Sequence, residues 1–266
     1  MKIISLVDDI SREGYYPEHG LSLYIETEKH KILFDLGQGE ALERNAQKAG
    51  VDLKGVDIVV ISHGHYDHGG ALKRFLEINN IAKVYIRSTA FLPYYSAAHE
   101  PPKYIGLDAT LAGSDRLVSV DGEYEIDDEL LLWSVRDACE CYSTANDVLY
   151  GADGAKDDFC HEHNLLIRSG SRVLISGCSH RGIVNILRES DVYRPDVYIG
   201  GFHLINPTTG KTVDADILEG VAEAIRRRAG SRFYTCHCTG REAYEYLSAR
   251  CGNLRYLYCG DVVTID

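Results

Sequence analysis

Proline, tryptophan, methionine and positive charge are all scarce in this sequence. Six prolines and one tryptophan occur in 266 residues, and no proline-rich stretch marks a linker between domains. No apolar run approaches the ~20 residues that a membrane helix needs, and the first residues, MKIISLVDD, lack a secretory cleavage pattern. We therefore expect a cytoplasmic protein without a membrane partner.

Basic side chains are outnumbered, since 28 Lys and Arg face 40 Asp and Glu for a formal net charge of −12. Such a surface repels nucleic-acid phosphates unless a basic groove or bound metal ions offset it. We expect a small-molecule substrate and no nucleic-acid partner. Eight cysteines in a chain of this size and compartment indicate reduced thiols. Cys236 and Cys238, spaced C-x-C, are expected to face the core or solvent.

Hydrophobic patterning predicts strand hairpins and helices in both halves of the chain. Strands are predicted over residues 2–7, 21–26, 31–35, 57–61, 83–86, 130–135, 165–168, 172–176, 196–199, 232–235 and 254–258. Helices are predicted over residues 40–49, 71–78, 183–189, 213–228 and 241–250. This order indicates one α/β domain over residues 1–266, with two mixed β-sheets face to face and helices outside them.

Two stretches do not fit the pattern of strands and helices. Residues 88–113 are rich in tyrosine, alanine and proline, and residues 136–160 are acidic and contain glycine. Long loops inside a compact domain are often functional, so both are predicted to be lid-like insertions. The tyrosines of the first stretch would serve equally well to bury a contact in a homodimer.

Residues 62–70, SHGHYDHGG, concentrate three imidazoles and a carboxylate directly after an apolar β-run. Imidazole nitrogens and carboxylate oxygens are ordinary ligands of zinc and similar metals. On a tight loop alternate residues point the same way, so His63 and His65 can share one metal ion. Asp67 and His68 then turn toward a second ion. The alternative, a solvated histidine-rich turn, does not explain so dense a cluster.

This H-x-H-x-D-H pattern resembles the metallo-β-lactamase superfamily, and residues 34–37, FDLG, are similar to the first motif of that superfamily. One branch is especially similar, which groups uncharacterised metal-dependent hydrolases with the archaeal dihydropterin-aminobenzene-ribofuranosyl phosphate synthase. The segments that carry this similarity are 18–22 (EHGLS), 104–106 (YIG), 158–162 (DFCHE), 176–180 (SGCSH), 200–204 (GGFHL) and 237–240 (HCTG). The resemblance implies a four-layer αβ/βα sandwich. It also implies two divalent transition-metal ions, zinc first, with iron or manganese as alternatives.

The resemblance implies further metal ligands from the second half of the chain. His161 stands where the third motif of the superfamily supplies a histidine, and His163 competes with it for that role. Cys178 stands where many relatives carry a metal-bridging aspartate and some a metal-binding cysteine, so it is a candidate ligand. His180, two residues further on, is another candidate ligand. His237 matches the last histidine of the superfamily, a ligand of the second metal ion.

Other residues are implied to act around the metal ions. Asp35 would support the ligands from behind, and His19 would orient one of them in the same way. Asp67 would orient the nucleophile as well as bind metal, and His203 would donate a proton or stabilise developing negative charge. Substrate contacts are predicted for three tyrosines of the first insertion, Tyr94, Tyr95 and Tyr104.

Together these observations predict a metal-dependent hydrolase in which two metal ions activate a hydroxide. The expected substrate is small and anionic, with an ester-type bond in a phosphoester or a carboxylic derivative. Two alternatives are a synthase-type enzyme of pterin and ribosyl phosphate metabolism and a non-catalytic metal-binding sensor. A sensor would have a closed metal site without an open coordination position.

Overall fold

Short, wholly apolar runs form the central strands of this protein. Strands β4 (Ile58–Val60), β10 (Leu130–Trp133) and β14 (Val197–Gly200) are buried at every residue. A sheet with one face in water would instead alternate buried and exposed side chains along each strand. Both faces of each sheet must therefore be covered by other layers of the structure.

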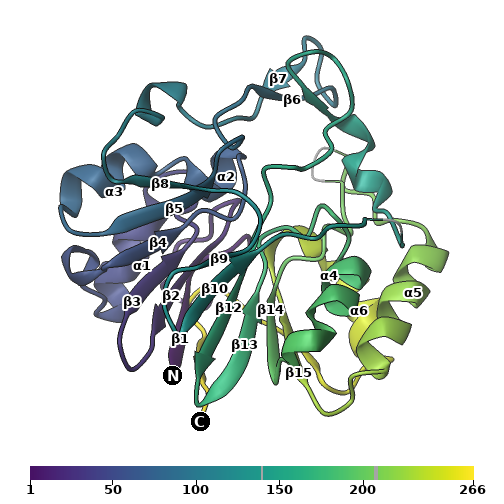
Figure 1. The fold of residues 1–266 in the computed structure, drawn as a ribbon. Helices are drawn as coiled ribbons and strands as arrows, with labels where there is room; N and C mark the ends of the chain where they lie inside the picture. Colours follow the sequence, from purple (N-terminus) through teal and green to yellow (C-terminus); the bar gives the residue numbers. More distant parts are fainter. Residues whose placement is uncertain (139, 207–208) are drawn as a thin grey trace.

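The computed structural model describes residues 1–138, 140–206 and 209–266 and contains two seven-stranded sheets that lie face to face (Figure 1). The first sheet has the order β17-β1-β2-β3-β4-β5-β8, and the second has the order β16-β15-β14-β13-β12-β10-β9. The remaining strands of the first sheet are β1 (Lys2–Val7), β2 (Ser22–Glu26), β3 (Lys31–Phe34), β5 (Lys83–Arg87), β8 (Leu117–Val120) and β17 (Val262–Thr264). Those of the second are β9 (Tyr124–Glu125), β12 (Asn164–Ser169), β13 (Ser171–Ile175), β15 (Arg232–Thr235) and β16 (Leu254–Tyr256).

Helices cover the outer faces of both sheets (Figure 1). Helices α1 (Ala41–Ala49), α2 (Tyr66–Gly69) and α3 (Leu72–Ile78) belong to the first half of the chain, and α4 (Ile183–Ser190), α5 (Ala215–Arg226) and α6 (Arg241–Ser248) belong to the second. No helix in the described part of the chain is both long and apolar enough to cross a membrane.

Three apolar layers hold the sandwich together. Phe34 and Leu165 belong to the layer between the two sheets. Phe75 belongs to the layer between the first sheet and its helices. Ile225 and Phe233 belong to the layer between the second sheet and its helices. The predicted arrangement of two mixed sheets with flanking helices is therefore confirmed.

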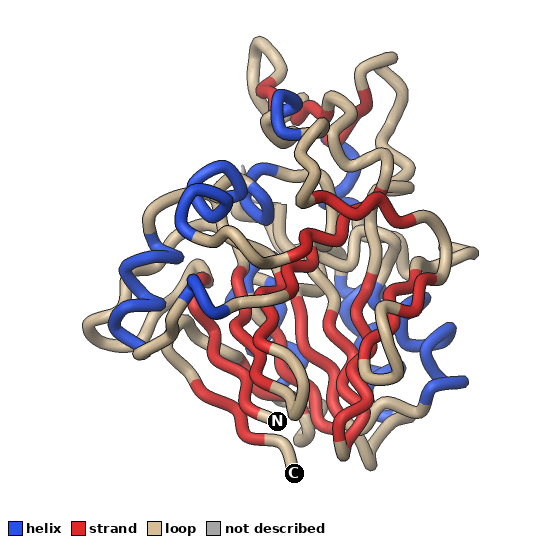
Figure 2. Tube along the Cα trace, turned by 60° about the vertical axis from the view of Figure 1, so that its left-hand side comes forward, coloured by secondary structure: helices blue, strands red, loops and turns tan. Residues whose placement is uncertain are grey.

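The two insertions come together in a third, smaller sheet that the sequence pattern did not predict. Its order is β11-β6-β7, with β6 (Tyr94–Ser96) and β7 (Lys103–Tyr104) from the first insertion and β11 (Leu149–Gly151) from the second. It stands at the end of the sandwich opposite the two chain termini (Figures 1 and 2). We call residues 88–113 and 136–160 together the lid.

A histidine far from the lid connects the two halves of the sandwich. His30, just before β3, lies between two carboxylates, with Nδ1 3.1 Å from Asp57 Oδ2 and Nε2 2.7 Å from Asp127 Oδ2. Burial lowers the pKa of His30, but the hydrogen bonds with Asp127 and Asp57 outweigh it, so the pKa is raised above 6.5. Folding therefore favours the protonated imidazole.

We predict that the stabilisation by His30 is present below pH 6.5 and is lost as the pH rises through its raised folded-state pKa. The difference in free energy of unfolding between wild type and His30→Gln should therefore be larger at about pH 6 than at about pH 9. Urea unfolding of both proteins at the two pH values measures it. An equal difference at both values would contradict the prediction.

Candidate metal centre

The candidate site residues follow the carboxyl ends of strands that run in the same direction. Strands β1 and β3 are both antiparallel to β2, and β3 is parallel to β4. Strands β13, β14 and β15 are likewise parallel to one another. Strands β1, β3 and β4 therefore end at one edge of the first sheet, and β13, β14 and β15 end at one edge of the second. Such an edge is a common place for sites in α/β proteins. Within three residues after these strand ends lie Asp8 and Asp9, Asp35, His63, Cys178, His203 and His237.

Residues 62–70, which we call the histidine segment, are held against the lid. A Cβ atom on Gly64 would lie 2.4 Å from the carbonyl oxygen of Ala90, so only glycine permits this approach. The backbone N–H of Tyr66 donates to Ile105 O at 2.9 Å, and His65 forms a β-bridge with Gly106. The lid and the histidine segment therefore have a fixed register.

Three histidines form the first cluster of possible ligands. One ring nitrogen from each of His63, His65 and His180 lies within 4.8 Å of the others, and all three side chains are buried. In the described residues the Nε2 atoms of these three rings have no hydrogen-bond partner. Burial lowers the pKa of each of the three imidazoles and so favours their neutral forms.

Hydrogen bonds decide which nitrogen of two of these rings is free. His180 Nδ1 lies 2.8 Å from Asn146 Oδ1, which can only accept, so Nδ1 carries the proton and Nε2 keeps a lone pair. Ser62 Oγ donates to Asp35 Oδ2 at 2.7 Å and can therefore accept from His63 Nδ1, which lies 2.8 Å away. The free lone pair of His63 is again on Nε2.

A second cluster surrounds Asp67. Its Oδ2 atom lies 3.3 Å from His237 Nε2, 3.4 Å from His19 Nε2 and 3.6 Å from His68 Nε2. Burial raises the pKa of Asp67, but the neighbouring imidazoles of His68 and His237 lower it well below its usual range. His68 Nδ1 lies 2.7 Å from Asp35 Oδ2, so its Nε2 atom also faces the cluster.

His161 does not offer a free lone pair. Its Nδ1 accepts from the backbone N–H of Gly64 at 2.9 Å, so Nε2 must carry the proton that it shares with Asp157 Oδ2 at 3.0 Å. These two hydrogen bonds argue against the predicted ligand role of His161 and favour His180, whose Nε2 atom has no partner among the described residues. The competing His163 donates from Nε2 to Ile61 O at 2.8 Å, and burial lowers its pKa to about 4.

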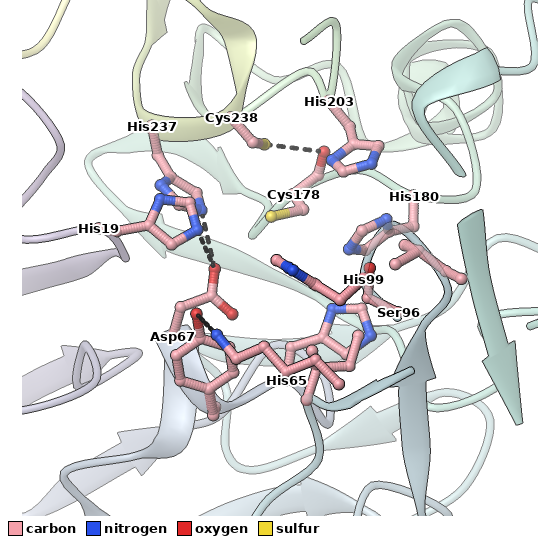
Figure 3. A pocket seen from close by; sticks show the side chains of 14 residues that line it. His19, His65, Asp67, Ser96, His99, Cys178, His180, His203, His237 and Cys238 are labelled. Carbon is pink, nitrogen blue, oxygen red and sulfur yellow. Dashed lines mark hydrogen bonds and ion pairs between the residues drawn. The ribbon is translucent and has the colours of Figure 1, made fainter. Parts of the chain in front are cut away.

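The two cysteines of the C-x-C pair differ. Cys236 is fully buried in the layer between the sheets, whereas Cys238 lines the cavity described below, which the sequence pattern did not indicate. Cys238 Sγ lies 3.6 Å from Cys178 O (Figure 3). Cys178 Sγ lies 3.2 Å from His68 Nε2, and burial raises the pKa of this thiol. Cys178 groups with ligands of both clusters and so lies between them.

His203 is buried at the wall of the same site. Within the described chain neither of its ring nitrogens has a hydrogen-bond partner, and its ring centroid lies 4.2 Å from that of His180. The backbone φ of His203 is 48°, which is uncommon for a residue other than glycine. The hydroxyl of Ser143 donates to the carbonyl oxygen of His203 and so helps to hold this conformation.

A cavity of about 400 Å³ opens above both clusters (Figure 3). The metal-binding candidates form its floor, and the lid supplies one wall. The residues that line it are His19, His65, Tyr66, Asp67, Ser96, His99, Lys103, Ile105, Leu149, Cys178, His180, His203, His237 and Cys238. Its size suits a small molecule.

The three tyrosines predicted to bind substrate are not among the described residues that line this cavity. Tyr94 donates from its hydroxyl to Thr89 O at 2.8 Å, and its ring packs on His161. Tyr104 donates to Leu107 O at 2.7 Å, and Tyr95 packs against Tyr104. We correct the prediction accordingly, because the polar tips of Tyr94 and Tyr104 are engaged within the lid.

Several supporting residues were missed in the sequence. Asp9 lies 2.9 Å from His19 Nδ1 through one carboxylate oxygen and 3.1 Å from His237 Nδ1 through the other. The neighbouring Asp8 accepts from the backbone N–H of His237 at 2.6 Å. The sequence did contain a signal for these two residues, because Asp8 and Asp9 directly follow an apolar strand. The second insertion supplies Asn146 and Asp157, for which the sequence contained no local signal.

The two clusters fit divalent transition metals. Buried imidazole nitrogens without hydrogen bonds are costly unless another partner satisfies them. Imidazole, carboxylate and thiol together form a ligand set for zinc, and iron also accepts such ligands. Each ring whose tautomer is fixed has a carboxylate, amide or hydroxyl behind it, as metal-binding histidines usually do.

A family model described as the metallo-β-lactamase superfamily matches residues 15–157, more than half of the chain. The chain belongs to the metallo-β-lactamase superfamily. Its fold and the position of its histidine segment agree with this membership.

Relatives match the chain along most of its length. A crystal structure described as a metal-dependent hydrolase of the β-lactamase superfamily is 30% identical, with a TM-score of 0.82, and covers 100% of this chain and 99% of its own. An uncharacterised protein of Methanocaldococcus jannaschii is 30% identical over 98% of both chains. A dihydropterin-aminobenzene-ribofuranosyl phosphate synthase from the same organism is 26% identical over 91% of this chain and 89% of its own.

We predict that His180→Gln and His161→Gln differ in metal binding. Loss of His180 removes a free lone pair from the first cluster, and metal affinity should fall by more than the roughly 10–100-fold typical of a supporting residue. His161→Gln should cause a smaller loss, because His161 has no free lone pair. Competition with a chromogenic chelator and elemental analysis measure both variants. A larger loss in His161→Gln would show that the assignment is reversed.

Proposed function

We propose that this protein holds two divalent transition-metal ions and hydrolyses an ester-type bond in a small anionic substrate, a phosphoester or a carboxylic derivative. The observation that carries the proposal is the convergence of two clusters of free ligand atoms on the floor of one cavity. Membership of the superfamily and the 30% identity with a metal-dependent hydrolase support the reaction class. Zinc fits the ligand set best, with iron or manganese as alternatives.

Two divalent ions bound in these clusters would lower the pKa of a water molecule and polarise an oxygen of the substrate. The side chains of the protein provide the remaining steps. The carboxylate of Asp67 faces the cavity and can orient the attacking water. His203 has ring nitrogens without protein partners and can donate a proton to the leaving group or hold developing negative charge.

Lys103 supports an anionic substrate. It is the one lysine or arginine that lines the cavity in the described part of this acidic chain. Its Nζ atom donates to the hydroxyl of Tyr66 at 3.1 Å and lies 4.6 Å from the centre of the Tyr66 ring. Ser96 lines the cavity near it, because Ser96 and Lys103 are cross-strand partners. Ile105 and Leu149 supply an apolar wall for the body of the substrate.

A second candidate is a synthase-type reaction that joins two substrates. The 26% identity with the dihydropterin-aminobenzene-ribofuranosyl phosphate synthase over 91% of the chain favours it. The two candidates differ in their products, because hydrolysis adds water to one substrate whereas a synthase releases a condensed molecule.

We predict turnover of an ester-type substrate by the metal-loaded protein, with products that have gained one water molecule. A panel of phosphodiesters, phosphate monoesters, thioesters and lactones, analysed by mass spectrometry, tests this. Asp67→Asn should lower kcat by at least about 10²-fold, whereas His30→Gln, far from the cavity, should leave it unchanged. Condensed products would favour the synthase. No turnover of this panel with zinc, iron or manganese would contradict the hydrolase.

We predict that Lys103→Met raises KM for an anionic ester about tenfold, equivalent to ~1.4 kcal/mol, and leaves kcat nearly unchanged. The lost charge weakens binding of the ground state and the transition state alike. Steady-state kinetics on an anionic ester and on its neutral analogue measure the effect. Lys83→Met on β5, also an exposed lysine, is the matched control. An equal rise in KM for the neutral analogue would rule out a charge-specific role.

A further inference from the structure

The contacts that surround Asp67 Oδ2 are longer than ordinary hydrogen bonds. The distances to His237, His19 and His68 Nε2 are 3.3, 3.4 and 3.6 Å, whereas N–H···O bonds are roughly 2.7–3.2 Å long. In the described residues His237 Nε2 has no hydrogen-bond partner. Three imidazole nitrogens therefore face one carboxylate oxygen at ion-pair distances that are longer than ordinary hydrogen bonds.

The distances fit ligands that share one ion. Zinc binds nitrogen at about 2.0–2.1 Å and carboxylate oxygen at about 2.0–2.2 Å, in tetrahedral geometry. Ligand atoms on such a tetrahedron are about 3.3–3.5 Å apart by the same geometry. The separations of His19 and His237 from the Asp67 oxygen lie in this range, and that of His68 is only slightly longer.

Asp9 prepares His19 and His237 in the same way. One carboxylate oxygen lies 2.9 Å from His19 Nδ1 and the other lies 3.1 Å from His237 Nδ1. A carboxylate can only accept, so both Nδ1 atoms carry protons and both Nε2 atoms can present lone pairs. A carboxylate behind a metal-bound histidine is the usual support for this tautomer. Figure 3 shows the His19 and His237 rings side by side, both facing the Asp67 carboxylate.

We propose that His19 is a direct ligand of the second metal ion, together with Asp67, His68 and His237. The inference rests on the proposed two-metal function. It replaces the expectation that His19 only orients a ligand, and it assigns that supporting role to Asp9.

The proposal makes the two metal positions unequal. The second position has four protein ligands besides Cys178, which lies between the positions, and the first has the three histidines His63, His65 and His180. A position with three protein ligands keeps a coordination site for substrate or water. Substrate exchange is therefore expected at the three-histidine position.

Cadmium-113 NMR of the cadmium-loaded protein tests the assignment, because scalar coupling between the metal and ring protons requires a coordinate bond. We predict coupling to the rings of His19, His68 and His237 from one cadmium signal. In His19→Gln the dissociation constant of that cadmium ion should rise at least about tenfold, while the His68 and His237 couplings persist. His30→Gln, which also removes an imidazole held by two carboxylates, is the matched control and should keep all three couplings.

Coupling to His68 and His237 without coupling to His19 would overturn the inference and leave the two-metal function standing. A single cadmium signal in the wild-type protein would instead overturn the two-metal centre and the inference with it. Because the side chain of His19 is 39% exposed, His19→Gln is expected to fold. The persistent couplings of His68 and His237 report that fold directly.

Discussion

The buried carboxylate of Asp35 is the interaction on which the site depends. It is fully buried at the end of β3 and accepts from the backbone N–H and the hydroxyl of Ser62, each at 2.7 Å. It also lies 2.7 Å from His68 Nδ1. Through Ser62 it orients His63, so one carboxylate sets a ring in each cluster. A buried charge is tolerated only with such partners, and Asp35 has a backbone φ of 60°, which aims it into the site.

The same principle recurs with other acceptors around the clusters. Asp9 faces two imidazoles, and Asn146 faces His180. Asp157 accepts from His161 and lies 3.9 Å from His65 Nε2. Some of the acidic residues that the chain has in excess thus contact the ring nitrogens of histidines. At these positions the carboxylates favour bound cations. Metal ions bound there, as proposed above, would reverse the local charge and let an acidic protein receive an anionic substrate.

The lid supplies part of the cavity wall and also supports histidines of the candidate site. Its second insertion carries Asn146 and Asp157, which support histidines, and its first insertion carries Lys103 and Ile105 at the cavity wall. Pairing of β6 with β11 joins the two insertions, and the Tyr66–Ile105 hydrogen bond ties them to the histidine segment. The cavity wall and the ligand supports therefore belong to one connected unit.

The sequence by itself determined the sandwich and the core of the metal cluster. Apolar runs and hairpins define the strands, and four candidate ligands fall within six residues, so local backbone geometry brings them together. Only the tertiary structure favours His180 over His161 as a ligand, because that preference depends on which ring nitrogen a distant Gly64 or Asn146 engages. It likewise placed the Asp9 carboxylate beside the Nδ1 atoms of His19 and His237. It also directed the hydroxyls of Tyr94 and Tyr104 toward backbone carbonyls within the lid. Sequence spacing carries no information on such long-range partners, and hydrogen bonds from remote strands decide which lone pairs remain free.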